Sequence, residues 1–145
     1  MMIVKAQAAD IQELARLSLQ LWPEHELDEM ALEFEAFLKD DDTALFLAVE
    51  EKAVGFAQCQ LRRDYVEGTE SSPVGYLEGI FVEEPFRSRG CARALLAACE
   101  AWAKEQGCSE FASDCELNNT MSLAFHLSAG FEEANRIICF TKKLQ

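Results

Sequence analysis

The first forty residues carry apolar side chains at the spacing of amphipathic helices. Residues 10–13 (Asp-Ile-Gln-Glu) have the form of a capping box, and an apolar series with helical spacing follows: Ile11, Leu14, Leu17 and Leu21. Trp22-Pro23 ends this helix because proline disfavours the α conformation in the residue before it. Asp28 is the expected cap of a second helix, which ends at residues 40–42, three consecutive aspartates.

Several short apolar segments have the length and composition of strands. One begins at Val4, and two more, 44–50 and 54–61, flank a tight turn and predict a hairpin. A polar segment, 62–73, then separates the hairpin from a further strand at 74–82. Loops of this length in compact domains often carry function, so segment 62–73 is a candidate for ligand contact.

The second half of the chain alternates helices and strands. Helices are expected at about 92–106 and 119–129, each followed by a glycine in the C′ position. Strands are expected at 110–114 and at 136–142, the latter rich in Ile and Phe. The order predicts an α/β (α+β) fold, a mixed sheet with helices on its faces, in one domain spanning residues 1–145.

Charge narrows the range of partners. Thirteen Lys and Arg against 26 Asp and Glu give a net charge of −13. Nucleic-acid binding needs a basic surface, and anionic membranes are disfavoured for the same reason. An acidic protein attracts cations, although solubility alone also explains the charge. With no apolar run long enough to span a membrane and no signal peptide, we expect a cytoplasmic protein.

Six cysteines give no sign of a disulfide framework or a metal site. Their spacings are irregular, no C-x-x-C pair occurs, and only His25 and His126 are available as imidazole ligands. We therefore expect no metal, and cysteines that are mostly small, buried apolar residues.

The most informative motif is Arg87-x-x-Gly90-x-Ala92, placed between a predicted strand and a predicted helix. The start of a helix presents unpaired N–H groups and the positive end of the helix dipole. Gly90 allows the backbone to approach a ligand, and Arg87 and Arg89 add positive charge within an acidic chain. The motif predicts a site for phosphate groups.

This motif resembles the pyrophosphate loop of the GNAT superfamily of N-acetyltransferases. Asn119 and the sequence His126-x-x-x-Gly130-Phe131 also stand where that family has a coenzyme-contacting asparagine and a Tyr-x-x-x-Gly-Phe ending. More specifically, the chain is similar to the aminoglycoside 6'-N-acetyltransferases in five segments, several of them loops: 21–23, 63–68, 71–74, 77–82 and 112–114. The resemblance covers essentially the whole chain.

The resemblance implies a fold, a cosubstrate and a set of site residues. The fold is a mostly antiparallel twisted sheet flanked by helices, and the cosubstrate is acetyl-CoA. The implied coenzyme-binding residues are Ile80, Phe81, Val82, Arg87, Ser88, Arg89, Gly90, Cys91, Ala92 and Asn119. The implied residues around the aminoglycoside are Trp22, His25, Tyr65, Glu78 and Asp114. Relatives are commonly dimers, so a homodimer is expected.

Glu78 and His126 are the candidate catalytic residues. An ammonium group must lose a proton before its nitrogen attacks a thioester, and a carboxylate such as Glu78 accepts that proton directly or through water. Glu78 also has the simpler interpretation of a solvent-facing strand residue, and Asp114 that of a turn cap. His126 either protonates the leaving thiolate or is hydrogen-bonded beside Phe125 and Phe131.

Two alternative functions remain at the level of sequence. The first is an acetyltransferase of the same fold acting on a polyamine or a peptide amine, since acidic residues attract those cations too. The second is a domain that binds acetyl-CoA or drug without catalysis. One departure from the relatives bears on substrate range: Ala134-Asn135 stands where they tend to have Thr-Glu, so a carboxylate is missing.

Overall fold

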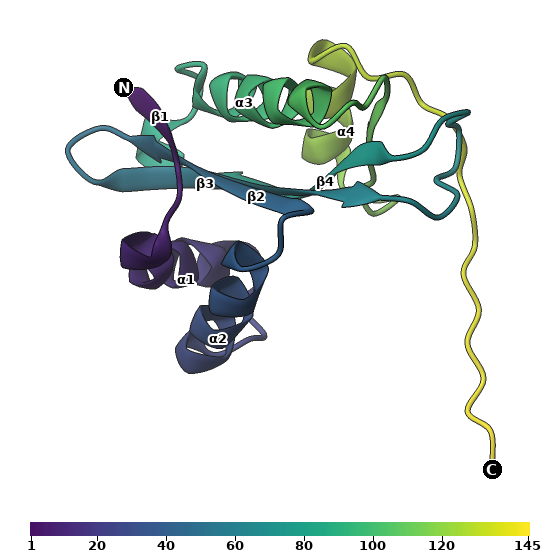
Figure 1. Cartoon of the computed structure of the whole chain (residues 1–145), viewed down its shortest axis with the longest axis horizontal. Coiled ribbons are helices and arrows are strands. Elements are labelled where there is room, and N and C mark those ends of the chain that lie inside the picture. The colour runs from purple at the N-terminus through teal and green to yellow at the C-terminus, as the bar shows by residue number, and fades with distance from the viewer.

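A five-stranded sheet in the order β1-β2-β3-β4-β5 forms the centre of the computed structural model, which describes residues 1–145 (Figure 1). The strands are β1 (Met2–Lys5), β2 (Thr43–Val49), β3 (Ala53–Arg62), β4 (Val74–Val82) and β5 (Phe111–Ser113). Neighbouring strands from β1 to β4 are antiparallel, and β5 lies parallel to β4. The expected mixed, mostly antiparallel sheet is confirmed.

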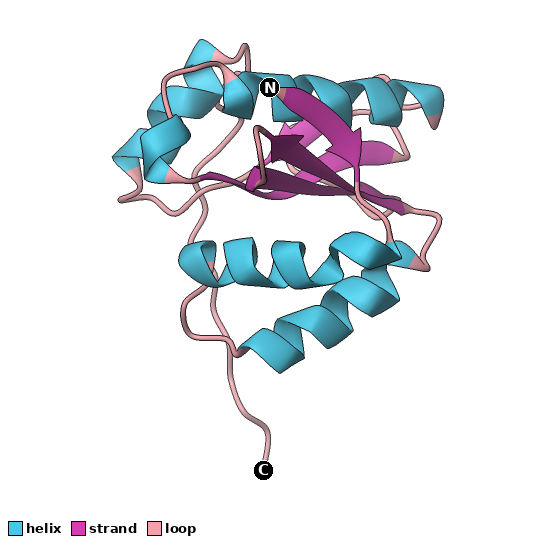
Figure 2. Cartoon of the chain, turned by 90° about the vertical axis from the view of Figure 1, so that its left-hand side faces the viewer, coloured by secondary structure: helices cyan, strands magenta, loops and turns pink.

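Helices cover both faces of the sheet (Figure 2). Helices α1 (Ile11–Leu21) and α2 (Leu27–Leu38) lie on one face, and α3 (Cys91–Glu105) and α4 (Thr120–Ser128) lie on the other (Figure 1). Two short 3-10 turns, η1 (Ala8–Asp10) and η2 (Glu84–Phe86), precede α1 and follow β4. None of the helices has the length and apolar composition that a membrane crossing requires.

Two hydrophobic cores, one on each face, explain the uninterrupted apolar sequence of β2. Leu45 and Leu47 pack with the side chains of α1 and α2, whereas Ala44, Phe46 and Ala48 belong to the core beneath α3. Successive strand residues point to opposite faces, so a strand buried on both faces is apolar throughout. The sheet is thereby fixed between two helical layers.

The first two helices begin differently from the sequence expectation. The Asp10 carboxylate accepts the N–H of Gln7 and makes no side-chain bond at the start of α1, because the 3-10 turn η1 comes first. Helix α2 is capped by Glu26 and not by Asp28, and the Glu29 carboxylate accepts the N–H of Glu26 at 3.3 Å. The helices themselves lie where their apolar spacing placed them.

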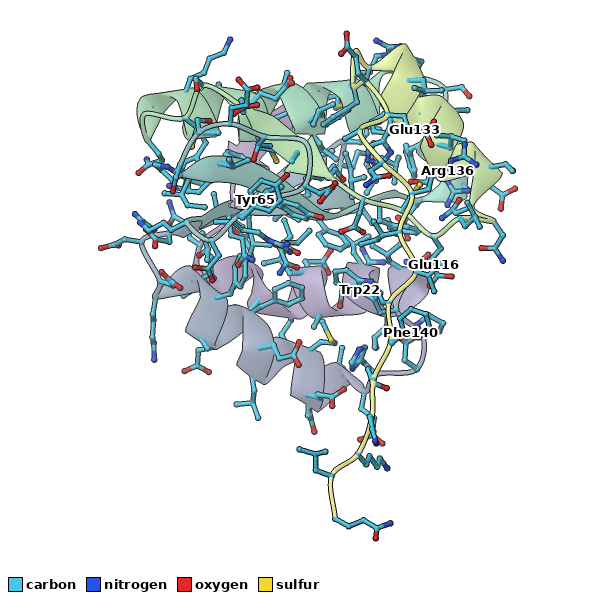
Figure 3. All side chains as sticks on the ribbon, turned by 90° about the vertical axis from the view of Figure 1, so that its right-hand side faces the viewer. Trp22, Tyr65, Glu116, Glu133, Arg136 and Phe140 are labelled. Carbon is cyan, nitrogen blue, oxygen red and sulfur yellow. The ribbon has the colours of Figure 1, made fainter.

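The predicted strand at 136–142 is wrong for the isolated chain. Residues from Phe131 onward form no helix or strand, and every residue from Glu132 to Gln145 is exposed. This segment leaves the body of the protein and ends well away from it (Figures 1 and 3). A strand needs a partner for its backbone groups, and the single chain offers this segment none.

Candidate active site

Strands β4 and β5 pair over only part of their length and then diverge. Strand β4 pairs with β5 only over Gly75–Leu77, opposite Phe111–Ser113, and then continues to Val82 without a neighbour on that side. The backbone N–H and C=O groups along this edge are therefore available to an extended ligand. The predicted coenzyme-contacting residues Ile80, Phe81 and Val82 all lie on this free edge.

Glu78 lies at a β-bulge where the divergence begins. In the pairing with β3, Gln58 stands opposite Gly79 and Cys59 opposite Leu77, so Glu78 has no partner. Bulges redirect side chains and are frequent beside active sites. The Glu78 side chain is 20% exposed, so its carboxylate is accessible to a ligand but mostly shielded from solvent.

Residues of β3 hold the Glu78 carboxylate. The Arg62 guanidinium donates from Nη2 to both oxygens, at 2.9 and 2.8 Å, and from Nε to Oε2 at 3.2 Å. Gln60 Nε2 donates to Oε2 at 2.5 Å. The charge of Glu78 is therefore paired, which neither the functional nor the solvent-facing interpretation of the sequence had included.

A buried tyrosine links this cluster to the second predicted carboxylate. The Tyr76 hydroxyl donates to Asp114 Oδ2, and the Arg62 guanidinium stacks over the Tyr76 ring at 3.4 Å from its centroid. Burial and the hydrogen bond to Asp114 raise the pKa of Tyr76, so the hydroxyl keeps its proton. Glu78 and Asp114, distant in sequence, thus share one polar network.

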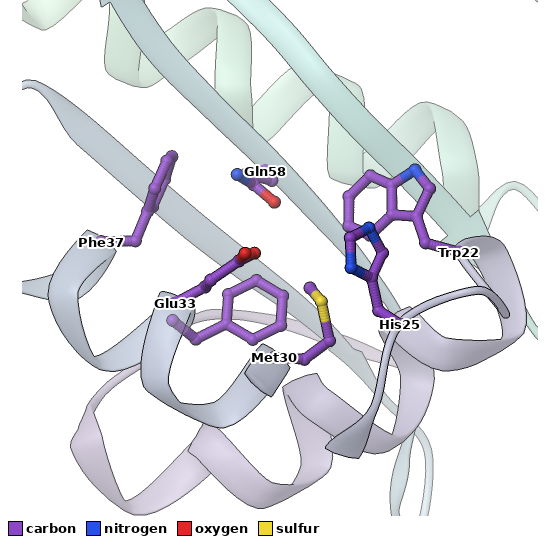
Figure 4. A pocket seen from close by; sticks show the side chains of 7 residues that line it. Trp22, His25, Met30, Glu33, Phe37 and Gln58 are labelled. Atoms are coloured by element: carbon purple, nitrogen blue, oxygen red, sulfur yellow. The ribbon is translucent and has the colours of Figure 1, made fainter. Parts of the chain in front are cut away.

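A cavity of about 200 Å³ opens between the first two helices and the sheet (Figure 4). Its lining includes the predicted residues Trp22 and His25, the acidic residue Glu33, and four residues that the sequence did not point to: Met30, Phe34, Phe37 and Gln58. Trp22 also closes over the bulge, because a Cβ at Gly79 would lie 2.7 Å from Cζ2 of its ring. The cavity is therefore adjacent to Glu78.

The polar groups at the cavity mouth are mostly acidic. His25 Nδ1 lies 2.7 Å from Glu29 Oε1, and its Nε2 lies 3.6 Å from Glu24. The hydrogen bond to Glu29 is the main cause that raises the pKa of His25, and the charges of Glu24 and Glu33 act in the same direction. Three carboxylates around one imidazole leave this mouth negative, as a cationic ligand requires.

Tyr65 lies apart from this cavity. Its side chain is 76% exposed in the loop that joins β3 to β4, and its hydroxyl lies 3.4 Å from the N–H of Gly68. The carboxylate of Glu110 fixes the loop by accepting the N–H of Glu70 and the hydroxyl of Ser71. Tyr65, predicted among the residues around the aminoglycoside, is therefore not part of the cavity lining.

A second cavity, of about 190 Å³, lies at the start of α3. Its lining includes most of the predicted loop residues: Arg87, Ser88, Gly90, Cys91 and Ala92. Gly90 (φ +85°) is the N-cap of α3 and Ser88 has φ +63°, so the loop turns sharply and exposes the first N–H groups of the helix. This is the expected geometry for binding phosphate groups.

The arginines of this loop occupy different places. Arg87 Nε donates to the carbonyl of Val82 at 2.7 Å, which ties the loop to the free edge of β4. Arg89 lies over the Phe86 ring and does not line the cavity. Arg93, which the motif does not include, does line it and donates to the Ser128 carbonyl at 2.8 Å.

Asn119 and His126 have structural partners in helix α4. Asn119 is the N-cap, and its Oδ1 accepts the N–H of Ser122 at 3.1 Å. His126 Nδ1 lies 2.7 Å from the Ser122 carbonyl, which requires the proton on that nitrogen, and Nε2 lies 2.8 Å from Ser113 Oγ. Since Ser113 pairs with Leu77, His126 lies at the point where β4 and β5 diverge.

The sequence is similar to those of known acetyltransferases. Residues 9–131 match the family model described as "Acetyltransferase (GNAT) family". The chain is 43% identical over 145 residues to an aminoglycoside N(6')-acetyltransferase type 1 of Stenotrophomonas maltophilia, covering 99% of this chain and 94% of that protein. It is 45% identical over 128 residues to the protein of the same description from Salmonella typhimurium, covering 88% of each.

Solved structures agree with the sequence relatives. AAC(6')-Iy in complex with the bisubstrate analog CoA-S-monomethyl-acetylneamine superposes with a TM-score of 0.95 at 41% identity, covering 99% of this chain and 98% of that one. The aminoglycoside antibiotic 6'-N-acetyltransferase AAC(6')-Ih from Acinetobacter baumannii gives a TM-score of 0.94 at 35% identity, with 99% of each chain covered.

Proposed function

The chain belongs to the acetyltransferase (GNAT) family, and we propose that it transfers the acetyl group of acetyl-CoA to the 6'-amino group of aminoglycoside antibiotics, which inactivates them as a resistance mechanism. The observation that carries this proposal is the free edge of β4 between Glu78 and Val82. One end of that edge meets the loop that leads into α3, with its cavity, and the other meets a pair of carboxylates beside an acidic cavity. Its sequence relatives carry the same activity in their names.

The coenzyme fits the loop and the free edge together. The N–H groups at the start of α3 receive the pyrophosphate, with Arg87, Arg89 and Arg93 nearby as cations. The backbone of Ile80–Val82 pairs with the amide groups of the pantetheine arm, as an added strand would. Asn119, at the N-cap of α4, contacts the same arm from the other side of the opening.

The acceptor fits the acidic end. Glu78 and Asp114 bind ammonium groups, Trp22 and His25 line the adjoining cavity, and the exposed Tyr65 contacts a part of the acceptor that extends out of the cavity toward the loop. An aminoglycoside carries several ammonium groups, so its charge complements that of a chain with a net charge of −13.

The residues at the divergence perform direct transfer between the two ligands. Glu78, directly or through water, accepts the proton of the acceptor ammonium, and the freed nitrogen forms a bond to the thioester carbon. Backbone N–H groups of β4 stabilise the charge that develops on the carbonyl oxygen. The C–S bond breaks, the nitrogen gives up its second proton, and His126 passes that proton to the departing sulfur.

No cysteine is required as a covalent intermediate. Cys59 and Cys99 form a buried pair in the core, where their mutual hydrogen bond and burial raise the pKa of Cys99 and disfavour the reactive thiolate. The two exposed cysteines, Cys115 and Cys139, lie outside both cavities.

Mass spectrometry of the products tests the proposed function. Tobramycin or kanamycin, incubated with acetyl-CoA and the purified protein, is expected to gain one acetyl group that fragmentation assigns to the 6'-nitrogen. Spermidine and amino-terminal peptides serve as competing acceptors. A faster reaction on either would make the chain an acetyltransferase for a different amine. Coenzyme binding without transfer to any amine would make it a binding domain.

We propose further that the protein is a homodimer. Seven of its twelve exposed large apolar side chains lie after residue 116: Leu117, Met121, Leu127, Ile137, Ile138, Phe140 and Leu144. The extended end of the chain, rich in Ile and Phe, lacks a strand partner, and β5 has an unpaired outer edge. In a dimer, residues 136–142 of each chain pair with the free edge of β5 in the other chain, so that both segments gain a strand partner.

Light scattering on the eluting peak of a gel-filtration column measures the dimer. Replacing Ile138 and Phe140 together by Asp is expected to shift the mass from about two chains to one. Leu32→Asp is the matched control, because Leu32 is an exposed apolar residue on α2 that belongs neither to β5 nor to segment 136–142. A doubly substituted protein that keeps the mass of two chains would refute this interface.

The remaining assignments are also proposals. We propose that residues 1–145 act as one acetyltransferase domain, supported by a single sheet that both cores share. We propose the cytoplasm as its location. The six free cysteines support this, because thiols stay reduced in that compartment.

A further inference from the structure

Arg62 is the only cation that contacts the Glu78 carboxylate, and its guanidinium is held on two sides. One side makes the three hydrogen bonds to the two carboxylate oxygens, and the planar face stacks on the ring of Tyr76. Tyr76 is buried and bonded to Asp114, so the support beneath the guanidinium is itself fixed. The position and orientation of the Arg62 guanidinium are therefore fixed.

The positive charge of Arg62 reduces the attraction between the Glu78 carboxylate and a cationic acceptor. The chain has twice as many acidic as basic residues, yet one of its thirteen cations neutralises the carboxylate nearest the reaction. A partly exposed ion pair adds little to folding stability, so stability alone is a weak reason for it. The geometry of the pair suggests a different purpose.

The hydrogen bonds leave one open position on Glu78. A carboxylate has about four lone-pair positions, two on each oxygen. Three donor contacts, two from Arg62 and one from Gln60, occupy Oε2 fully, whereas Oε1 accepts only one bond from Arg62. The bidentate contact also prevents rotation of the carboxylate, since guanidinium and carboxylate planes must stay aligned. A single lone pair of Oε1 is therefore presented in a fixed direction.

We propose that Arg62 is the positioning residue of the reaction: it locks the Glu78 carboxylate so that one lone pair of Oε1 faces the acceptor amine. This inference rests on the proposed function for the identity of the base, but not on which amine is the substrate. Misplacing a reacting group by about 1 Å costs on the order of a hundredfold in rate, so orientation of this kind affects turnover more than binding.

Three single substitutions at two positions and one double variant test the inference by the kinetics of acetyl transfer. Arg62→Met keeps the stem over Tyr76 and removes the guanidinium, and it is expected to lower kcat by about tenfold or more, with acceptor KM changed less than about threefold. Arg62→Lys supplies a point charge without the fork and is expected to recover only part of the loss. In a Glu78→Gln background, Arg62→Met should cause no further loss, because the carboxylate that it positions is gone.

Controls separate positioning from folding and from simple charge. Arg63→Met is the matched control, since the neighbouring Arg63 pairs with exposed Asp42 outside the site. Thermal unfolding and coenzyme affinity, measured for every variant, are expected to match the parent protein. Unchanged kcat with a lower acceptor KM in Arg62→Met would show that Arg62 merely competes with the substrate. Additive losses in the double variant would show that it does not act through Glu78, and either result overturns the inference.

The assays use whichever amine the parent protein acetylates. Preference for an amine other than the 6'-amino group would overturn the proposed substrate while the comparison of Arg62 variants still decides the inference. A parent protein that acetylates no amine would overturn both.

Discussion

Glu78 is the residue on which the proposed chemistry depends most. Glu78→Gln keeps the shape of the side chain and an oxygen for Arg62, but an amide does not accept the ammonium proton. We expect kcat to fall by about 10²- to 10⁴-fold, the usual contribution of a general base, with unchanged coenzyme affinity by calorimetry. Glu35→Gln, on the exposed face of α2, is the control. Full turnover in Glu78→Gln would exclude Glu78 as the base.

His25 offers a test of the acidic cavity mouth by pH titration. The hydrogen bond to Glu29 raises the pKa of His25 above its ordinary value of about 6.5. A raised pKa in the folded state stabilises the fold below the ordinary value, and that contribution is lost as the pH rises through the higher folded value. NMR titration is expected to show the raised pKa, and Glu29→Gln should lower it. An equal His25 pKa in both proteins would refute the contact.

Individual site residues were only partly predictable from sequence. Glu78 and Trp22 became candidates through the family resemblance, and the structure brings Trp22 against Gly79, the residue that follows Glu78 at the bulge. The partners Gln60 and Arg62 were missed, although their spacing of two put them on one face of a strand. Their contact with Glu78 depends on a cross-strand register and a bulge, which no local pattern encodes.

At the scale of elements, local pattern was enough wherever an element buries its own apolar face. Helix α3 and strand β4 lie within one residue of their expected bounds, because periodicity and a following glycine mark the helix and turn residues bound the strand. The segment 136–142 has the composition of a strand and forms none. A strand exists only with a partner, so its sequence indicates a preference and the presence of a pairing edge decides the outcome.

The two ends of helix α3 provide a prediction with a built-in control. Gly90 and Gly107 flank the helix, both have positive φ, and neither has an atom within 4 Å of the position that a Cβ would occupy. Alanine at either position should cost about 1–2 kcal/mol of stability through backbone strain. Only Gly90→Ala is expected to weaken acetyl-CoA binding as well, because Gly90 shapes the phosphate loop.

Calorimetry with coenzyme and chemical denaturation compare these two variants directly. Equal stability losses with a selective loss of coenzyme affinity in Gly90→Ala would support the loop assignment. Equal coenzyme affinity in both variants would place the pyrophosphate elsewhere.

At the scale of the whole molecule, the charge distribution of the protein accommodates two ligands of opposite charge. The net charge of −13 repels a coenzyme that carries phosphates, and the arginines around the start of α3 offset that repulsion locally. The same net charge attracts a polycationic acceptor toward Glu78, Asp114 and the acidic mouth of the cavity. Salt screens all of these interactions. The acceptor loses an attraction, whereas the coenzyme loses both an attraction and a repulsion, so the KM values of the two ligands should depend differently on salt.

Raising the ionic strength is expected to weaken binding of the acceptor more than binding of the coenzyme. The screening length shrinks from about 10 Å at 0.1 M salt to about 3 Å at 1 M, which removes the long-range attraction of an acidic surface for a polycation. Acceptor KM should rise several-fold over that range. Coenzyme KM should change less, because screening weakens its contacts with the loop arginines and also the repulsion from the rest of the chain. Initial rates with each substrate varied in turn measure both constants. Parallel changes in the two constants would mean that the net charge serves solubility and does not guide the acceptor to its site.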